Sequence, residues 1–366
     1  MKLLICASEY YPYGSGIANV AYNVVEQLKK MGVDCTVCSP TGPEIKLGSS
    51  KLIEKSGIVG LVYYWHRVSK YFKKNDFDIV WLHNPLFLES NPFQRSLITI
   101  CSTYYRAVVR KINPKIYYKI ASKIEKNCLN KIKEKARFTG VSTQVCEELK
   151  EIGIDRQRIV TILNGVDTER FKTIDDRKIR SELGLENKHI ILYVGRLARG
   201  KLVDTIIKSM PFILNEINNV KLLIVGDGPQ KNEIINIAKK LGIYNSIVLC
   251  GAQSNDKLPL FYSMADVVVC PYSGLVLFEA MSMGKAIVAF DVEWHSEVII
   301  NMKNGILVEN LNINKLSKAI IKLLENKEFS DKLGNNAREY AVNNLNWELI
   351  TERYLEEFEK VLSNEE

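Results

Sequence analysis

Two cationic side chains follow one apolar run in the second half of the chain. The run from Ile190 to Val194 leads into Gly195-Arg196-Leu197, and Lys201 lies five residues after Arg196, where a helix is expected to start. Cations at the carboxyl edge of a buried strand, beside a helix N-terminus, are well placed to neutralise a diphosphate. Solvated surface charges are the alternative interpretation.

A carboxylate and a possible phosphate loop occur together in the stretch Asp266 to Gly284. An apolar strand is followed by a short loop with Gly274 and by a helix that carries Glu279 in its first turns. A carboxylate there could accept hydrogen bonds from two vicinal hydroxyls, as on a ribose. Glu in an apolar helical segment is costly unless it is paired, which favours a binding role. Backbone N–H groups could hold phosphate oxygens at Gly274, Leu275 and Val276.

A glycine loop, Gly14-Ser15-Gly16, precedes the first expected helix and could also approach an anion through backbone N–H groups. A dinucleotide fingerprint would place its first glycine directly at the end of the strand and an acid after the second strand. Here the loop from Ser8 to Tyr13 intervenes, and the second strand ends in Ser39-Pro40. The pattern therefore disfavours an NAD-dependent dehydrogenase.

The elements that must position these residues alternate between short apolar runs and helical patterns, which predicts parallel sheets wrapped by helices. A chain of 366 residues exceeds one hydrophobic core, so we expect two doubly wound, Rossmann-like α/β domains. The first spans 1–168, with the helix 346–366 packing back on it, and the second spans 169–345. Strands are expected at 2–7, 34–39, 79–83, 138–141, 190–194, 221–225, 247–250, 267–270, 286–290 and 305–308.

The composition of the chain bears on whether the protein spans a membrane and on its cellular compartment. Apolar stretches of about six residues are too short for a membrane span, which needs about 20. The eight cysteines lie mostly inside apolar runs, which is typical of buried thiols in a reducing compartment. We therefore expect a cytoplasmic protein.

Charge is divided unevenly between the two halves. Residues 1–150 hold 23 Lys and Arg against 12 Asp and Glu, a balance of +11, whereas the remainder has 27 against 30, or −3. Most of the excess lies between Arg106 and Arg137, where basic residues alternate with tyrosines and isoleucines. Such a helix could lie on an anionic membrane or grip a polyanion, and a solvated basic face is equally compatible with it.

Taken in order, the motifs resemble glycosyltransferase family 4, retaining enzymes of GT-B fold, over nearly the whole chain. They are the Gly14 to Gly16 loop, Gly140-Val141-Ser142, Ile162 to Asp167 with Phe171, Tyr193 to Leu197 with Lys201, Val225 to Pro229, Gly274 to Met281, Glu297 and Asn304-Gly305. The resemblance implies a nucleotide-sugar donor, UDP- or GDP-linked, held by the second domain, and an acceptor in the first. It assigns Arg196 and Lys201 to the donor diphosphate and Glu279 to the ribose. The Gly14 to Gly16 loop would face the donor across the cleft between the domains.

The sequence departs from that family at one position. The family has two Glu separated by seven residues, and here Pro271 stands eight positions before Glu279, so the first Glu is absent. A polar and aromatic cluster follows the next strand and could take over contacts to the sugar. Trp294 could stack on it, while His295 or Glu293 could form hydrogen bonds. Simple packing of the Trp and His is the alternative.

His83 closes an expected strand, at an edge where an acceptor hydroxyl could sit, and is counted with Arg196 and Lys201 as a candidate catalytic residue. We expect transfer of a sugar to a glycan or lipid-linked acceptor, at the inner face of the membrane, without a metal, a cofactor or nucleic acid. A nucleotide-sugar binding protein that has lost transfer, or a sugar-nucleotide epimerase, remains an alternative.

Overall fold

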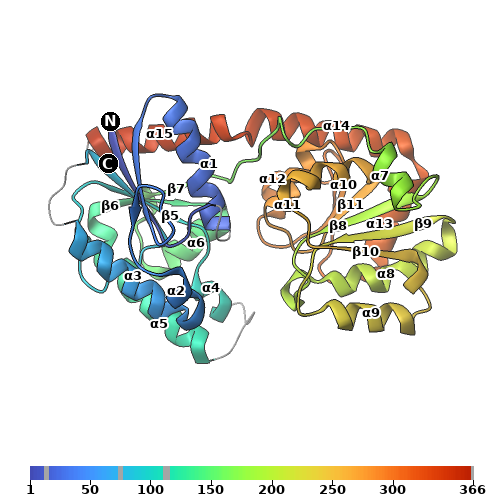
Figure 1. Cartoon of the computed structure of the whole chain (residues 1–366), viewed down its shortest axis with the longest axis horizontal. Helices are drawn as coiled ribbons and strands as arrows, with labels where there is room; N and C mark the ends of the chain where they lie inside the picture. The colour runs from blue at the N-terminus through green and yellow to red at the C-terminus, as the bar shows by residue number, and fades with distance from the viewer. Residues whose placement is uncertain (12–15, 73–76, 110–115, 364–366) are drawn as a thin grey trace. The chain divides into compact units, whose positions relative to one another are not determined.

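The computed structural model describes residues 1–11, 16–72, 77–109 and 116–363, which form two α/β units (Figure 1). The first unit comprises Met1–Asn164 and Trp347–Glu366, and the second comprises Gly165–Asn346. The first domain was expected to end at residue 168 and the chain to return at residue 346. In the structure the first unit ends at Asn164, and the chain returns to it at Trp347.

The first unit is built on a parallel seven-stranded sheet with the order β3-β2-β1-β4-β5-β6-β7. Residues of the first strand alternate between its two faces. Leu3 and Ile5 pack with the helices at 16–30 and 347–363, whereas Leu4 and Cys6 pack with the helices at 58–71, 116–132 and 143–152. Burial on both faces explains why these strands read as continuous apolar runs. The strands are β1 (Lys2–Ala7), β2 (Asp34–Ser39), β3 (Ile45–Lys46), β4 (Ile79–His83), β5 (Ser96–Ile100), β6 (Ala136–Gly140) and β7 (Ile159–Thr161).

The helices of this unit are α1 (Gly16–Lys30), α2 (Ser50–Ser56), α3 (Ile58–Tyr71), α4 (Tyr104–Val109), α5 (Ile116–Ile132), α6 (Thr143–Ile152) and α15 (Trp347–Ser363). The helix α15 returns from the second unit and contacts α1 and three strands. Its Tyr354 and Phe358 rings lie 4.8 and 5.7 Å from the ring of Trp81 on β4. The C-terminal helix thus packs on the first unit, as expected from its apolar face.

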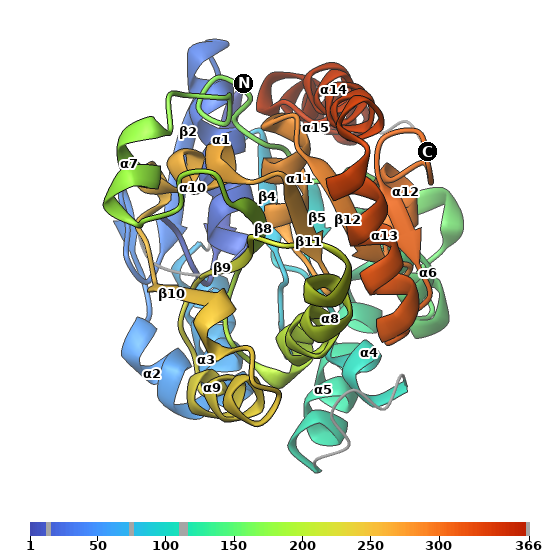
Figure 2. The same ribbon diagram turned by 90° about the vertical axis from the view of Figure 1, so that its right-hand side faces the viewer.

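The second unit contains a parallel six-stranded sheet with the order β10-β9-β8-β11-β12-β13. Helices α8, α9 and α13 cover one face, while α10 and α11 lie on the other (Figures 1 and 2). The strands are β8 (His189–Val194), β9 (Val220–Val225), β10 (Ile247–Gly251), β11 (Val267–Cys270), β12 (Ala286–Phe290) and β13 (Ile306–Val308). The helices are α7 (Arg177–Glu182), α8 (Val203–Glu216), α9 (Lys231–Lys240), α10 (Leu258–Met264), α11 (Leu275–Ser282), α12 (His295–Val298), α13 (Ile313–Glu325) and α14 (Lys327–Asn344).

Both sheets confirm the expected doubly wound α/β class, and the expected strands lie close to their observed bounds. The expected strands did not include β3, β5 and β7, which have two, five and three residues. Among the helices of the described residues, none is long and apolar enough to cross a membrane.

In each sheet the strand order reverses beside the first strand, between β1 and β4 and between β8 and β11. Ligands of such sheets bind at this switch point, outside the carboxyl ends of the strands.

Candidate functional site

The switch point of the second unit is framed by two loops whose backbones touch. Gly195 donates its N–H to the Val225 carbonyl at 2.9 Å, and Leu197 donates to Asp227 at 2.9 Å. A Cβ at Gly226 would lie 1.9 Å from the Gly195 carbonyl oxygen, and its φ of 148° also favours glycine. The loop after β9 therefore supports the loop after β8 directly, and the latter carries Arg196.

The two predicted cations stand at this edge. Arg196 is exposed, and its carbonyl accepts a hydrogen bond of 3.2 Å from the hydroxyl of Tyr193. Lys201 is half-buried, and its Nζ lies 5.5 Å from the centroid of the Tyr272 ring, in the loop after β11. The structure thus brings Lys201 to the predicted phosphate loop, whereas Arg196 remains at the surface beside it.

His295 holds that phosphate loop in place. Its Nε2 accepts the Ser273 N–H at 3.3 Å, and its Nδ1 lies 2.9 Å from the Phe290 carbonyl oxygen, so the tautomer protonated on Nδ1 satisfies both contacts. The residue is 1% exposed. Burial lowers its pKa, and the charge of Lys201 adds to that effect. The expectation that His295 bonds a sugar is corrected: both ring nitrogens are engaged by backbone groups, so it positions the loop.

The helix that follows the loop presents Glu279. The Tyr262 hydroxyl on α10 donates to its Oε2 at 2.8 Å. Burial raises the pKa of Glu279 to about 7, although the Tyr262 hydrogen bond and the charge of Arg170 oppose that rise. Tyr262 was missed from the sequence, because it lies on another helix, 17 residues upstream. It orients one carboxylate oxygen.

The start of α11 follows the expected pattern. Gly274 precedes the helix without a side-chain cap, and Leu275 and Val276 form its first turn. First-turn N–H groups have no partner within their own helix, so they are donors for an anion. Gly16 is the first residue of α1. Gly14 and Ser15, the rest of the predicted N-terminal loop, lie outside the described residues.

Glu293 and Trp294 follow β12 on the same edge of the sheet. Glu293 has a φ of 55°, in the left-handed region that a glutamate rarely occupies. Burial raises its pKa to about 8. The Trp294 ring packs 5.1 Å from the Phe278 ring and 5.2 Å from that of His295. Trp294 is thus engaged in packing, while Glu293 is half-buried and has a strained backbone.

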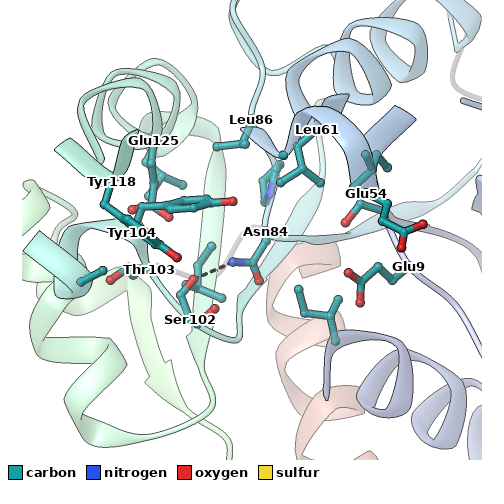
Figure 3. A pocket seen from close by; sticks show the side chains of 18 residues that line it. Glu9, Glu54, Leu61, Asn84, Leu86, Ser102, Thr103, Tyr104, Tyr118 and Glu125 are labelled. Atoms are coloured by element: carbon teal, nitrogen blue, oxygen red, sulfur yellow. Dashed lines mark hydrogen bonds between the residues drawn. The ribbon is translucent and has the colours of Figure 1, made fainter. Parts of the chain in front are cut away.

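The switch point of the first unit holds a pocket of about 420 Å³ (Figure 3). Its floor follows β1, β4 and β5, and Asn84 clamps it by accepting the Cys101 N–H at 2.9 Å and donating to the Ser102 carbonyl at 2.8 Å. Its walls come from α1 to α5. The lining residues are Ser8, Glu9, Ile17, Ile53, Glu54, Gly57, Leu61, Asn84, Pro85, Leu86, Ile100, Ser102, Thr103, Tyr104, Ala107, Tyr118, Glu125 and Leu129.

His83 does not line this pocket, although it ends the strand beneath it. Its side chain is 0% exposed, and its ring centroid lies 4.2 Å from that of Trp81. Within the described residues neither ring nitrogen has a hydrogen-bond partner, and burial lowers the pKa of His83 to about 3. The expectation of a catalytic His83 at an acceptor hydroxyl is corrected: the strand turns this neutral ring into the core.

Across the part of the chain that the structure describes, no three His, Cys, Asp or Glu side chains gather as a metal site.

The residues that line the pocket of the first unit were not predicted from the sequence, because they come from separate segments. A signal that could have pointed to them is the polar stretch directly after each of the strands β1, β4 and β5.

Comparison with known families yields two adjoining matches. Residues 14–170 match the model "Glycosyltransferase Family 4", and residues 175–340 match "Glycosyl transferases group 1". An uncharacterized glycosyltransferase of Methanocaldococcus jannaschii is 30% identical over 227 residues, which are 59% of this chain and 58% of that protein. The chain thus matches little more than half the length of this relative.

Two solved structures share the fold along the whole chain. Sucrose-phosphate synthase from Thermosynechococcus elongatus has a TM-score of 0.79 at 20% identity, with 100% of both chains covered. Anabaena HepE in complex with UDP-glucose has a TM-score of 0.75 at 17% identity, covering 98% of this chain and 100% of that one. At these identities the likeness establishes the two-domain GT-B fold.

Proposed function

Because this chain belongs to glycosyltransferase family 4, we propose that it transfers a sugar from a nucleotide-sugar donor to an acceptor with retention of anomeric configuration. The second unit would bind the donor and the first the acceptor. A single observation supports the donor site best: Lys201, the loop before α11 and the half-buried Glu279 all gather at the switch point of the second sheet.

In this proposal the chain acts on the donor by electrostatics. Lys201 and Arg196 hold the diphosphate and stabilise the charge that grows on it as the sugar departs. N–H groups at the start of α11 add donors to the same oxygens. Glu279, which Tyr262 orients, accepts hydrogen bonds from the ribose hydroxyls while its carboxyl group is ionised. No step requires a metal ion or a cofactor, and UDP- and GDP-linked donors are both candidates.

The donor site is tested by Arg196→Ala and Lys201→Ala. Each removes one charge-assisted contact to the diphosphate, so calorimetry should show UDP or GDP binding weakened by about 1.5 to 3 kcal/mol. Lys208→Ala is a matched control, because Lys208 lies on α8 and pairs with Asp204 at 2.7 Å. Unchanged affinity in both site variants would refute this assignment.

Turnover separates the proposed transferase from its alternatives. Incubation with a panel of donors and acceptors, followed by mass spectrometry, should yield a glycosylated acceptor and free nucleoside diphosphate. A protein that binds donors tightly but yields neither product would be a nucleotide-sugar binding protein. Conversion of the donor sugar to its epimer without transfer would indicate an epimerase.

We further propose that α5 docks the enzyme on the cytoplasmic face of an anionic membrane, where a lipid-linked acceptor would be available. Ile116 and Ile120 are 77% and 54% exposed, and Lys119, Lys123 and Lys126 are exposed on the same helix. Apolar and basic side chains together favour an anionic interface.

Liposome cosedimentation tests this docking. Binding to phosphatidylglycerol vesicles should exceed binding to phosphatidylcholine vesicles, decrease with salt, and fall in Ile120→Asp. Lys322→Asp, at an exposed position of α13 in the other unit, provides the control. Absence of binding to anionic vesicles would leave α5 a solvated helix.

A further inference from the structure

The pocket of the first unit differs in charge from the protein around it. Residues 1–150 carry a balance of +11, yet the described residues that line the pocket include three glutamates and no lysine, arginine or histidine. Building on the proposed function, we propose that this pocket receives an acceptor group that is polyhydroxylated and carries a protonated amine, such as an amino sugar or an aminocyclitol.

Two carboxylates lie on one side of the pocket. Glu9 follows β1 and is half-buried, whereas Glu54 lies on α2 and is exposed at the rim. Figure 3 shows both on the side opposite Tyr104 and Tyr118. A protonated amine between them gains charge-assisted hydrogen bonds, which are stronger than neutral ones.

The third glutamate contributes to the wall. Glu125 on α5 accepts the Tyr105 N–H at 3.0 Å, at the start of α4. It is buried, and burial raises its pKa to about 7, although hydrogen bonds from the Tyr104 and Tyr105 N–H groups oppose that rise. Because Glu125 is committed to α4, most of the discrimination by charge falls to Glu54, which is exposed at the rim.

A serine hydroxyl also belongs to the pocket. Ser8 lines the pocket and is 5% exposed. A hydroxyl can both donate and accept a hydrogen bond, so it is suited to an acceptor hydroxyl. The pocket thus offers a neutral polar contact in addition to its carboxylates.

Aromatic rings form the opposite wall. The Tyr104 and Tyr118 ring centroids are 6.3 Å apart, and both residues line the pocket (Figure 3). Such rings cover the apolar face of a saturated ring, and they attract an ammonium group within about 6 Å. A phosphate here would meet carboxylates, and none of the described lining residues is a cation that would compensate its charge, which is unfavourable in a partly buried site.

Calorimetry with matched ligands tests this assignment on the full chain. Glucosamine and 2-deoxystreptamine should bind at least about tenfold more tightly than glucose and myo-inositol, since one charge-assisted hydrogen bond contributes about that factor. Glucosamine 6-phosphate should bind more weakly than glucosamine. In Glu54→Gln the preference for the amine should fall to within about twofold. Glu352→Gln, at an exposed position of α15, should retain it.

Equal binding of amine and neutral ligands, or tighter binding of the phosphate ester, would overturn the inference. So would an amine preference that Glu54→Gln and Glu9→Gln both retain. UDP and GDP titrations on the same samples keep the two proposals apart. If the protein prefers amine ligands but does not bind UDP or GDP, only the donor site is refuted. If it binds UDP or GDP but shows no preference for amine ligands, only the amine pocket is refuted.

Discussion

At the scale of single residues, His295 and Glu293 have different roles although only two positions separate them. His295 joins the Ser273 N–H to the Phe290 carbonyl and so ties the phosphate loop to the end of β12. Glu293 is half-buried with a strained backbone. One residue therefore positions the donor loop, while the other is a candidate contact for the transferred sugar in place of the missing family glutamate.

Replacement of His295 should loosen the phosphate loop. His295→Ala leaves the Ser273 N–H without its acceptor, so UDP or GDP affinity measured by calorimetry should fall about fivefold, as for the loss of one hydrogen bond of about 1 kcal/mol. His295→Gln, which retains an acceptor and a donor, should recover part of that loss. The control is His189→Ala, at the exposed start of β8. Full nucleotide affinity in His295→Ala would contradict this positioning role.

Glu293 should make stability depend on pH. Its folded pKa of about 8 lies above the usual value, so the folded state binds the proton more tightly than the unfolded state. Its contribution is therefore complete at low pH and is lost as pH rises from about 5 through 8. Glu293→Gln should have a higher Tm than the parent protein at pH 9 and a similar one at pH 5, measured by calorimetry. Glu325→Gln, at an exposed position of α13, should show no such trend.

At the scale of elements, the proposed donor site depends on the contact between the loops after β8 and β9. The glycines at 195, 226 and 228 have φ values of 147°, 148° and 159°, and a Cβ at either of the last two would meet backbone atoms of the β8 loop. Because these glycines have no side chains, the backbones of the two loops can touch. This contact fixes the position from which Arg196 extends.

Gly226→Ala should therefore destabilise the second unit. The added Cβ meets the Gly195 carbonyl oxygen, and the backbone conformation alone costs about 1 to 3 kcal/mol. Denaturant unfolding followed by circular dichroism should show this loss. Gly200→Ala is the matched control, because Gly200 is exposed and a Cβ there has no atom within 4 Å. Equal unfolding midpoints for the two variants would show that the loops adjust freely.

At the scale of the whole molecule, the chain leaves the first unit at Asn164 and returns to it at Trp347. The returning helix α15 covers the central strands, and Arg137 on β6 pairs with the buried Glu357 at 3.0 Å. The core of the first unit is therefore incomplete until α15 has folded.

Truncation of a side chain on α15 should reveal that dependence. Phe358→Ala leaves a cavity beside Trp81 and should lower the free energy of unfolding of the first unit by about 3 to 5 kcal/mol. Calorimetry measures this change, and the intrinsic tryptophan fluorescence of the protein is a second probe. Glu352→Ala, on the exposed face of the same helix, should change it little. A wild-type transition in Phe358→Ala would indicate that α15 is dispensable for the first unit.

The amino-acid sequence by itself determined the class of fold and most of the proposed donor site. Apolar runs with turns between them predicted the strands, and residues at the carboxyl end of a strand lie at the sheet edge whatever the surrounding packing. For that reason the order of residue types was enough to assign Arg196, Lys201 and the loop at Gly274 to that edge. The apolar face of residues 347–362 likewise required a partner surface.

Only the tertiary structure decided which way individual side chains point and which segments meet. His83 and His295 both end or follow a strand, yet one faces the core and the other bonds two backbone groups. Tyr262 meets Glu279 from another helix, and the pocket of the first unit joins residues from Ser8 to Leu129. Such contacts depend on strand order and helix packing over long separations, which local patterns of residue type do not encode.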